Sequence, residues 1–223
     1  MAQQERAIRT RRLILEAAAA IFDERGYAST TIAEVLERAD VTKGALYFHF
    51  SSKEDLARGV LEAAVTTDGV RPQVLKLQEM IDILLLLAYR LPREPMLSAA
   101  LRMAVDLQSR RQFGTAWPDW TELLTGLLKD AKGRGEVLPH VDEAEIARML
   151  VCSWTGVRVV TEGLPGAHDL PREVTSLLQL LLPAIATPTV LPRVEISAAR
   201  AAHLYEDMPA WRAESGEYVG LPR

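Results

Sequence analysis

The sequence predicts an all-α protein in which a small N-terminal helical module precedes a larger helical body. Apolar residues recur at helical spacing along most of the 223 residues, and glycine and proline lie near the ends of the periodic segments. No segment alternates apolar and polar residues over the length that a strand requires. Apolar residues make up 48% of the chain and charged residues 25%, which is typical of a folded globular protein.

Four helices are expected in the N-terminal module, and capping residues mark where three of them begin. Thr31 and Glu34 have the spacing of a capping box, and Thr42 caps a very short helix. Two alternative boxes, at residues 51–54 and 52–55, open the fourth helix. The expected elements are Ala7–Arg25, Thr31–Ala39, Lys43–His49 and a fourth helix that runs to Ala64.

Five longer helices are expected in the body, because the apolar content rises beyond Gly69 and prolines lie near the segment ends. After Thr187 the periodicity weakens, so a short helix over 196–206 and an otherwise loosely held tail are expected. The expected body helices are Pro72–Tyr89, Pro95–Leu107, Pro118–Lys132, Asp142–Glu162 and Pro171–Ala186.

Composition and charge limit the classes of protein. The 26 Lys and Arg residues and 30 Asp and Glu residues give a net charge of -4, which excludes coating of nucleic acid by bulk positive charge but allows a small basic surface. The polar start of the sequence does not suit a secretion signal, and the aliphatic run 83–88 is too short to span a membrane. With Cys152 as the single cysteine, a reducing cytoplasm is the expected location, with no membrane association.

The second and third expected helices have the spacing of a helix-turn-helix, with residues 40–42 as the turn. Leu46 and Phe50 lie four residues apart and are expected to face inward. Lys43 and Tyr47, also four apart, then share another face. This arrangement favours an exposed side of the short helix that is suited to a DNA groove.

The side chains on that side fit contacts with DNA. Lys43 supplies a charge for a phosphate, Tyr47 a hydroxyl and a flat ring, and Gly44 lets the backbone approach a groove wall. Lys53 begins the next helix, where unpaired backbone N–H groups already favour a phosphate. The alternative is that the aromatic residues are core and the lysines only a solvated face.

The run from Tyr27 to Leu56, and above all "TKGALYFHFSSKEDL", resembles the DNA-binding domain of the TetR family of transcriptional repressors. The resemblance implies a homodimer that binds a pseudo-palindromic operator on double-stranded DNA and releases it when a small-molecule effector enters the C-terminal domain. It implies a DNA-binding domain at residues 7–67 and a ligand-binding and dimerisation domain at 68–187, and it leaves unexplained the C-terminal tail that we expect at 188–223. The residues that match DNA-contacting positions are Thr31, Thr42, Lys43, Gly44, Tyr47, His49 and Lys53. A structural hydrogen-bonding role is the alternative for His49.

Segments of the body, including "DWTELL", "GEVLPHVD" and "LVCSWTGVRVV", are similar to the gamma-butyrolactone receptors, a subfamily of actinobacterial repressors. The resemblance implies an effector that is a lactone, a butenolide or, for pseudo-receptors, an antibiotic. Trp120 matches the tryptophan that lines the subfamily's ligand pocket. Val151, Trp154, Thr155 and Arg158 share one helical face, on which Thr155 offers a hydroxyl to a carbonyl. The alternative is that both tryptophans are core residues.

Two body helices carry more apolar residues than one face can bury, which favours a four-helix dimer interface. Additional core within the monomer is the alternative. The residues concerned are Ala147, Leu150, Val151, Trp154 and Val157 on one helix, and Val174, Leu177, Leu178, Leu181 and Ile185 on the next.

We expect no enzyme, no metal site and no cofactor. The four histidines are scattered without metal-ligand spacing, and there is no glycine-rich phosphate loop. Two alternatives remain open. One is a repressor of the same fold that senses drugs or metabolites. The other is a helical small-molecule carrier or enzyme that retains the N-terminal module without using it.

Overall fold

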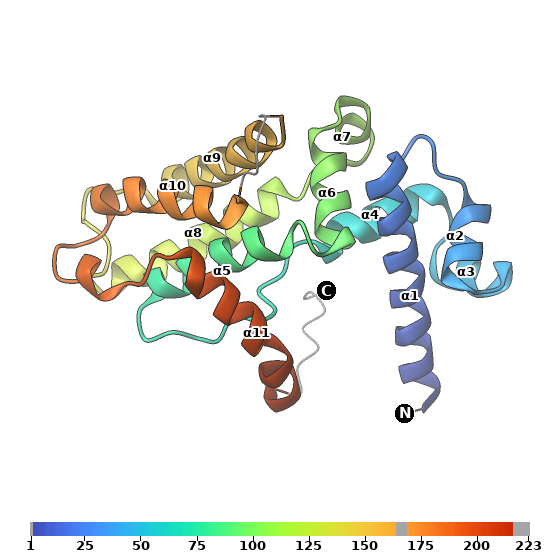
Figure 1. The fold of residues 1–223 in the computed structure, drawn as a ribbon, viewed down its shortest axis with the longest axis horizontal. Coiled ribbons are helices and arrows are strands. Elements are labelled where there is room, and N and C mark those ends of the chain that lie inside the picture. Colours follow the sequence, from blue (N-terminus) through green and yellow to red (C-terminus); the bar gives the residue numbers. More distant parts are fainter. Residues whose placement is uncertain (1, 164–168, 216–223) are drawn as a thin grey trace. The chain divides into compact units, whose positions relative to one another are not determined.

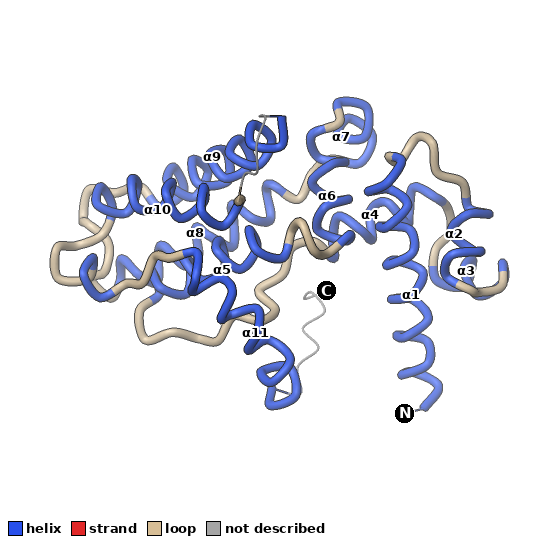
Figure 2. Tube along the Cα trace, viewed as in Figure 1, coloured by secondary structure: helices blue, strands red, loops and turns tan. Residues whose placement is uncertain are grey.

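Eleven α-helices make up most of residues 2–163 and 169–215, the part of the chain that the computed structural model describes (Figure 1). In these ranges the only β-type pairing is a single antiparallel bridge between Val137 and Ala186, and Figure 2 shows helices joined by loops. The predicted all-α fold class is therefore confirmed. The helices are α1 (Ala2–Arg25), α2 (Ile32–Ala39), α3 (Lys43–His49), α4 (Lys53–Ala63), α5 (Lys76–Arg90), α6 (Pro95–Val105), α7 (Leu107–Phe113), α8 (Trp117–Gly133), α9 (Glu143–Gly163), α10 (Leu170–Ile185) and α11 (Ala198–Ser215).

The described helices form two compact units. Unit 1 contains α1–α4 with α6 and α7, and unit 2 contains α5 with α8–α11. The sequence analysis places α6 and α7 in the body, whereas the structure groups them with the N-terminal helices because α6 packs along α1. Ser98 of α6 donates a hydrogen bond of 2.6 Å to the Asp23 carboxylate, and the Arg102 guanidinium donates to the Asp23 carbonyl. Such long-range pairs leave no trace in helical periodicity.

The predicted starts of α2, α3 and α4 are confirmed, whereas α1 begins at Ala2 rather than at Ala7. Thr31 and Glu34 form both arms of a capping box, and the Thr42 hydroxyl accepts from the backbone N–H of Ala45. Of the two alternatives for α4, the structure uses residues 52–55, since the Ser52 hydroxyl accepts from the N–H of Asp55 at 3.1 Å. These caps satisfy backbone donors that a helix start otherwise leaves unpaired.

The prediction of one helix over residues 95–107 is wrong at its C-terminal end. The helical conformation ends at Val105, and a separate helix, α7, begins after Asp106. The Asp106 carboxylate accepts from the N–H of Ser109 at 2.7 Å, and this hydrogen bond holds the pKa of the carboxyl below its usual range. An N-cap residue has an extended backbone, so an aspartate that caps α7 ends the helical conformation of α6.

α5 is the central helix of unit 2, and α8, α10 and α11 all pack against it. Its apolar residues are almost fully buried, with Leu77, Ile81 and Leu85 at 0% exposure. This all-round burial explains why the aliphatic run in α5 lacks the polar face of a surface helix. Within the described ranges no helix is both long and apolar enough to cross a membrane.

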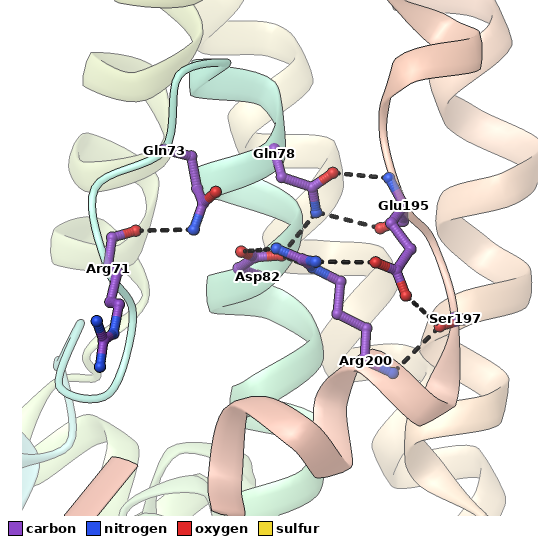
Figure 3. Close-up of polar contacts among 7 residues, drawn as sticks. All are labelled: Arg71, Gln73, Gln78, Asp82, Glu195, Ser197 and Arg200. Carbon is purple, nitrogen blue, oxygen red and sulfur yellow. Dashed lines mark hydrogen bonds and ion pairs between the residues drawn. The ribbon is translucent and has the colours of Figure 1, made fainter. Parts of the chain in front are cut away.

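The short helix expected over residues 196–206 is present as α11, but α11 is longer than expected and packs against α5. The last part of the expected tail, residues 216–223, lies outside the described residues. Asp82 of α5 is 0% exposed, and its carboxylate accepts hydrogen bonds from Arg200 at 2.5 and 2.7 Å (Figure 3). Gln78 donates to the same carboxylate and also pairs with the backbone of Glu195 (Figure 3). A buried carboxylate requires such partners, so α11 completes the polar side of α5.

We expect the Arg200→Ala variant to lose about 3 kcal/mol of unfolding free energy, because the buried Asp82 carboxylate then lacks its counter-charge. Urea denaturation measures this loss. The matched control is Arg193→Ala, which removes an exposed arginine before α11 and should change the unfolding free energy by less than about 0.5 kcal/mol. Equal losses in the two variants would contradict a structural role for the Asp82–Arg200 pair.

Candidate nucleic-acid interface

The turn between α2 and α3 sets the direction of α3. Asp40 takes a left-handed conformation at φ 51°, and its N–H bonds back to the carbonyls of Leu36 and Glu37. The chain then passes to Thr42, which caps α3. A helix, a sharp short turn and a second helix are the defining parts of a helix-turn-helix.

One side of α3 is buried and the other is exposed. Leu46 and Phe50 are 0% and 2% exposed, as the sequence predicts. On the opposite side Thr42, Lys43 and Tyr47 are exposed, and the Lys43 ammonium lies 5.9 Å from the centre of the Tyr47 ring. The packing of α3 therefore brings a positive charge and a phenol together on a surface that is open to a partner.

Gly44 lies on this exposed surface and has no packing role inside the protein. A Cβ atom added at Gly44 would meet no heavy atom within 4 Å, and the residue does not need a left-handed conformation. The absence of a side chain here is therefore not explained by the fold. We expect the missing side chain to let the helix backbone approach the wall of a DNA groove closely.

Phe48 also lies on this side of α3, although the sequence analysis does not count it among the DNA-contacting positions. Its side chain is 79% exposed, which is unusual for a large apolar residue, and its ring lies 4.9 Å from that of His49. An exposed ring on a groove-facing helix suits contact with thymine methyl groups. The signal was present in the sequence, because inward-facing residues at positions 46 and 50 leave position 48 on the outer side.

His49 is half-buried, and burial lowers its pKa, with the charge of Arg11 acting in the same direction. The imidazole is therefore neutral at pH 7 in the protein without DNA. A neutral ring can donate one hydrogen bond and accept another, which suits both a DNA contact and a structural role.

Thr31 and Lys53 lie at two other helix starts of unit 1. The backbone N–H and the hydroxyl of Thr31 both donate to the Glu34 carboxylate in the capping box, so both donors of Thr31 are already engaged within the protein. The Lys53 ammonium lies 4.2 Å from the centre of the Tyr27 ring and 3.4 Å from the Ala28 carbonyl oxygen. The structure therefore gives both residues local partners in addition to their position at helix N-termini.

The residues expected at a ligand site lie on α8 and α9 of unit 2, two helices that pack against each other. Trp120 of α8 and Thr155 of α9 are half-buried. Trp154 is only 6% exposed, and its indole N–H donates to the Leu84 carbonyl of α5 at 3.2 Å. Its N–H is thus occupied by the protein, and Trp154 serves as a core residue of unit 2.

The two remaining candidates on α9 flank this core. Val151 is half-buried, and the Arg158 guanidinium pairs with the Glu162 carboxylate at 2.7 Å. The guanidinium of Arg158 is thus already paired with a carboxylate of its own helix. Among the described residues no three His, Cys, Asp or Glu side chains gather where they could hold a metal ion.

Comparisons with known proteins cover both parts of the chain. The family described as "Bacterial regulatory proteins, tetR family" matches residues 14–60, and "Tetracyclin repressor-like, C-terminal domain" matches residues 75–187. The A-factor receptor protein of Streptomyces griseus is 36% identical over 198 residues, which cover 87% of this chain and 70% of the relative.

Solved structures agree with these matches. Full-length native TylP, a tetR regulator from Streptomyces fradiae, is 42% identical with a TM-score of 0.82, and the match covers 93% of each chain. A gamma-butyrolactone receptor described as an ArpA-like protein is 32% identical with a TM-score of 0.63, over 91% of this chain and 98% of its own.

A short helix that is buried on one side, exposed on the other and set by a tight turn defines a helix-turn-helix DNA-binding protein. The two family matches, one to the N-terminal part and one to the C-terminal part, together cover more than half of the chain. The chain belongs to the tetR family of bacterial regulatory proteins, and it is a DNA-binding transcriptional regulator of the ligand-responsive repressor type. Its relatives are regulators rather than enzymes.

The Gly44→Ala variant distinguishes an effect on stability from an effect on DNA affinity. We expect its unfolding free energy to stay constant or rise by up to about 1 kcal/mol, because alanine favours a helix and meets no neighbour here. We expect operator affinity to fall about tenfold or more, a loss of about 1.4 kcal/mol, because the new methyl group holds the helix away from the groove. Fluorescence anisotropy with labelled DNA measures the affinity.

The matched control is Gly126→Ala in α8, where an added Cβ atom also meets no heavy atom within 4 Å. This variant should show the same stability trend with unchanged DNA affinity. If Gly44→Ala binds DNA as tightly as Gly126→Ala does, the backbone of α3 does not approach the groove.

Proposed function

We propose that the chain is a homodimeric repressor that binds a pseudo-palindromic operator and leaves it when a gamma-butyrolactone or a related butenolide binds unit 2. The exposed side of α3 is the observation that carries operator binding, since it presents Lys43, Tyr47 and Phe48 together. An ammonium, a phenol and an apolar ring suit phosphate, base-edge and thymine-methyl contacts. In this proposal residues 7–67 contact DNA, and the part of 68–187 that lies in unit 2 binds the effector and the second protomer.

Similarity to receptors of known type supports the choice of effector. The relatives named above include an A-factor receptor and a gamma-butyrolactone receptor, and the similarity extends through the body as well as the DNA-binding region. A half-buried tryptophan on α8 offers a flat apolar surface to an alkyl chain. The half-buried Thr155 offers a hydroxyl to a lactone carbonyl, and the Trp154 ring serves only as a wall, because its N–H is engaged.

Release from DNA needs only a difference in effector affinity between two states. An effector that binds the DNA-free state a hundredfold better than the DNA-bound state supplies about 2.7 kcal/mol of coupling. By reciprocity, operator DNA lowers effector affinity by the same factor. No covalent step and no cofactor are required.

The outer sides of α9 and α10 support a dimer. Part of the predicted apolar stripe is core, because Ala147, Leu150, Trp154, Val174, Leu178 and Ile185 are buried within the chain. The rest stays half-exposed at Val151, Val157, Leu177 and Leu181. Leu180 and Val160 add side chains that are 82% and 58% exposed. On α10, residues 177, 180, 181 and 184 follow helical spacing, so they form one continuous apolar face that suits a second copy of the chain.

We expect Leu180→Asp to convert the dimer to a monomer, because a buried unpaired carboxylate in a dimer interface is strongly unfavourable. Analytical ultracentrifugation measures the change in mass. The control is Val74→Asp, which introduces the same charge at an apolar residue that is 83% exposed and precedes α5. A monomeric Val74→Asp variant, or a dimeric Leu180→Asp variant, would place the interface elsewhere.

The effector proposal is tested by release of DNA from the protein. With synthetic gamma-butyrolactones of increasing alkyl length, we expect Trp120→Leu to raise the half-release concentration about tenfold, a loss of about 1.4 kcal/mol of binding free energy. Trp117→Leu, which alters a half-buried tryptophan one turn earlier on α8, is the matched control. Gel-shift titration gives both values.

The same titration distinguishes the alternatives. Release by antibiotics but not by lactones would identify a pseudo-receptor or a drug-sensing repressor. Equal responses of Trp120→Leu and Trp117→Leu would contradict the assignment of Trp120 to the ligand site.

A further inference from the structure

An aromatic cluster in unit 1 joins three elements that are distant in the sequence. Tyr27 follows α1, and its ring lies edge-to-face against Phe22 of α1 at 5.5 Å between ring centres. On another side it meets Phe113, the last residue of α7, at 4.6 Å. Edge-to-face pairs of this kind are favourable beyond their burial, so α7 helps to fix the position of the Tyr27 ring.

The Tyr27 ring in turn holds Lys53. The Lys53 ammonium lies 4.2 Å from the ring centre and donates to the Ala28 carbonyl at 3.4 Å. The Tyr27 hydroxyl donates to the Glu54 carboxylate at 3.3 Å. Burial, reinforced by the charge of Glu54, raises the pKa of Tyr27 to about 12, so the hydroxyl keeps its proton at physiological pH.

Lys53 is the first residue of α4, a helix of 11 residues whose N-cap is Ser52. A lysine side chain has four rotatable bonds, and a ring beneath its ammonium restricts their conformations. Burial also lowers the pKa of Lys53, although nearby carboxylates oppose this effect. The ammonium is therefore partly stripped of water and held in place before DNA arrives.

We propose that Tyr27 and Phe113 are positioning residues that orient the Lys53 ammonium for a DNA backbone phosphate, so that α7 controls the strength of this contact. The inference rests on the proposed function, since it assumes that unit 1 binds operator DNA. It adds a physical connection from α7 to a DNA contact through two ring contacts. Each step is between groups that touch in unit 1.

The position of Phe113 in the chain provides a route by which effector binding changes the contact of Lys53 with phosphate. α7 ends at Phe113, and Gly114, at φ 77°, terminates it. Only residues 114–116 separate Phe113 from the start of α8, the helix that carries Trp120. A displacement of the start of α8 therefore reaches Phe113 through three residues of main chain. Separation of the Phe113 and Tyr27 rings then removes one of the contacts that fix the Tyr27 ring and, with it, the Lys53 ammonium.

A cluster that only packs the core predicts a different result from one that positions a charge. Removal of a phosphate contact lowers the salt dependence of DNA binding, and the slope falls by about 0.9 for each phosphate that the protein no longer neutralises. Weaker core packing lowers stability and affinity without changing the number of phosphates that the protein neutralises. The salt slope is therefore the measurement that separates the two roles.

The experiment uses the full-length chain and a DNA fragment that the wild-type protein selects from a random-sequence library. Dissociation constants are measured at several salt concentrations for wild type, Lys53→Gln, Phe113→Ala and the double variant. Leu107→Ala, at a residue of α7 that is 51% exposed, is the matched control. Tyr27→Phe keeps the ring and removes only the hydroxyl bond to Glu54. Thermal melts confirm that each variant is folded at the assay temperature.

We expect Lys53→Gln to lower the salt slope by about 0.9 for each protomer. Phe113→Ala should weaken binding about threefold for each protomer and lower the slope in the same direction. In the Lys53→Gln background, Phe113→Ala should cause no further loss of affinity. Tyr27→Phe and Leu107→Ala should keep the wild-type slope.

Three outcomes would overturn the inference, and they are distinguishable. If the wild type selects no DNA sequence, the proposed function fails and the inference with it. If the wild type binds but Lys53→Gln keeps the full slope, Lys53 contacts no phosphate. If Lys53→Gln lowers the slope while Phe113→Ala keeps it, or if the affinity losses add in the double variant, the aromatic cluster only packs the core.

Discussion

Burial of one side of α3 is the constraint on which the DNA-facing part of the molecule depends. A helix of seven residues is too short to be stable by itself, so its packing and its caps must hold it. Leu46 and Phe50 anchor it in unit 1, and the Arg11 guanidinium lies 5.1 Å from the centre of the Phe50 ring. Once these two residues are buried, the rotation of α3 is set, and Lys43, Tyr47 and Phe48 can only face outward. The fold thus creates a local basic and aromatic surface on a chain with a net charge of -4.

The division into two units explains how a body helix can influence the DNA-binding module. The hydrogen bonds from α6 to Asp23 join α6 to α1, and the contact of Phe113 with Tyr27 joins α7 to the loop after α1. The chain passes between the units after residues 66, 90 and 116, so α6 and α7 are tied at both ends to unit 2 helices. Under the proposed function, an effector bound near α8 acts on unit 1 through these main-chain connections.

Local chemistry made much of the fold predictable from the sequence. Caps at residues 31, 42 and 52 and the spacing of positions 46 and 50 depend only on near neighbours, and the structure has them as predicted. The break at Asp106 was missed because a capping aspartate resembles an ordinary surface residue of a continuing helix. α11 was underestimated because its main partner, Asp82, lies 118 positions before Arg200. The roles of the candidate ligand residues depend on packing between helices, and for the same reason periodicity could not separate the buried Trp154 from the half-buried Trp120.

The central claim is that the exposed side of α3 enters the DNA groove, and site-specific photo-crosslinking tests it most directly. A benzophenone amino acid replaces Phe48, 79% exposed on α3, or Val74, 83% exposed before α5. Each protein is then irradiated on DNA that the wild type selects. The account predicts cross-links from position 48 only, at bases in two half-sites about 34 Å apart along the duplex. Cross-links from position 74 without any from position 48 would contradict it.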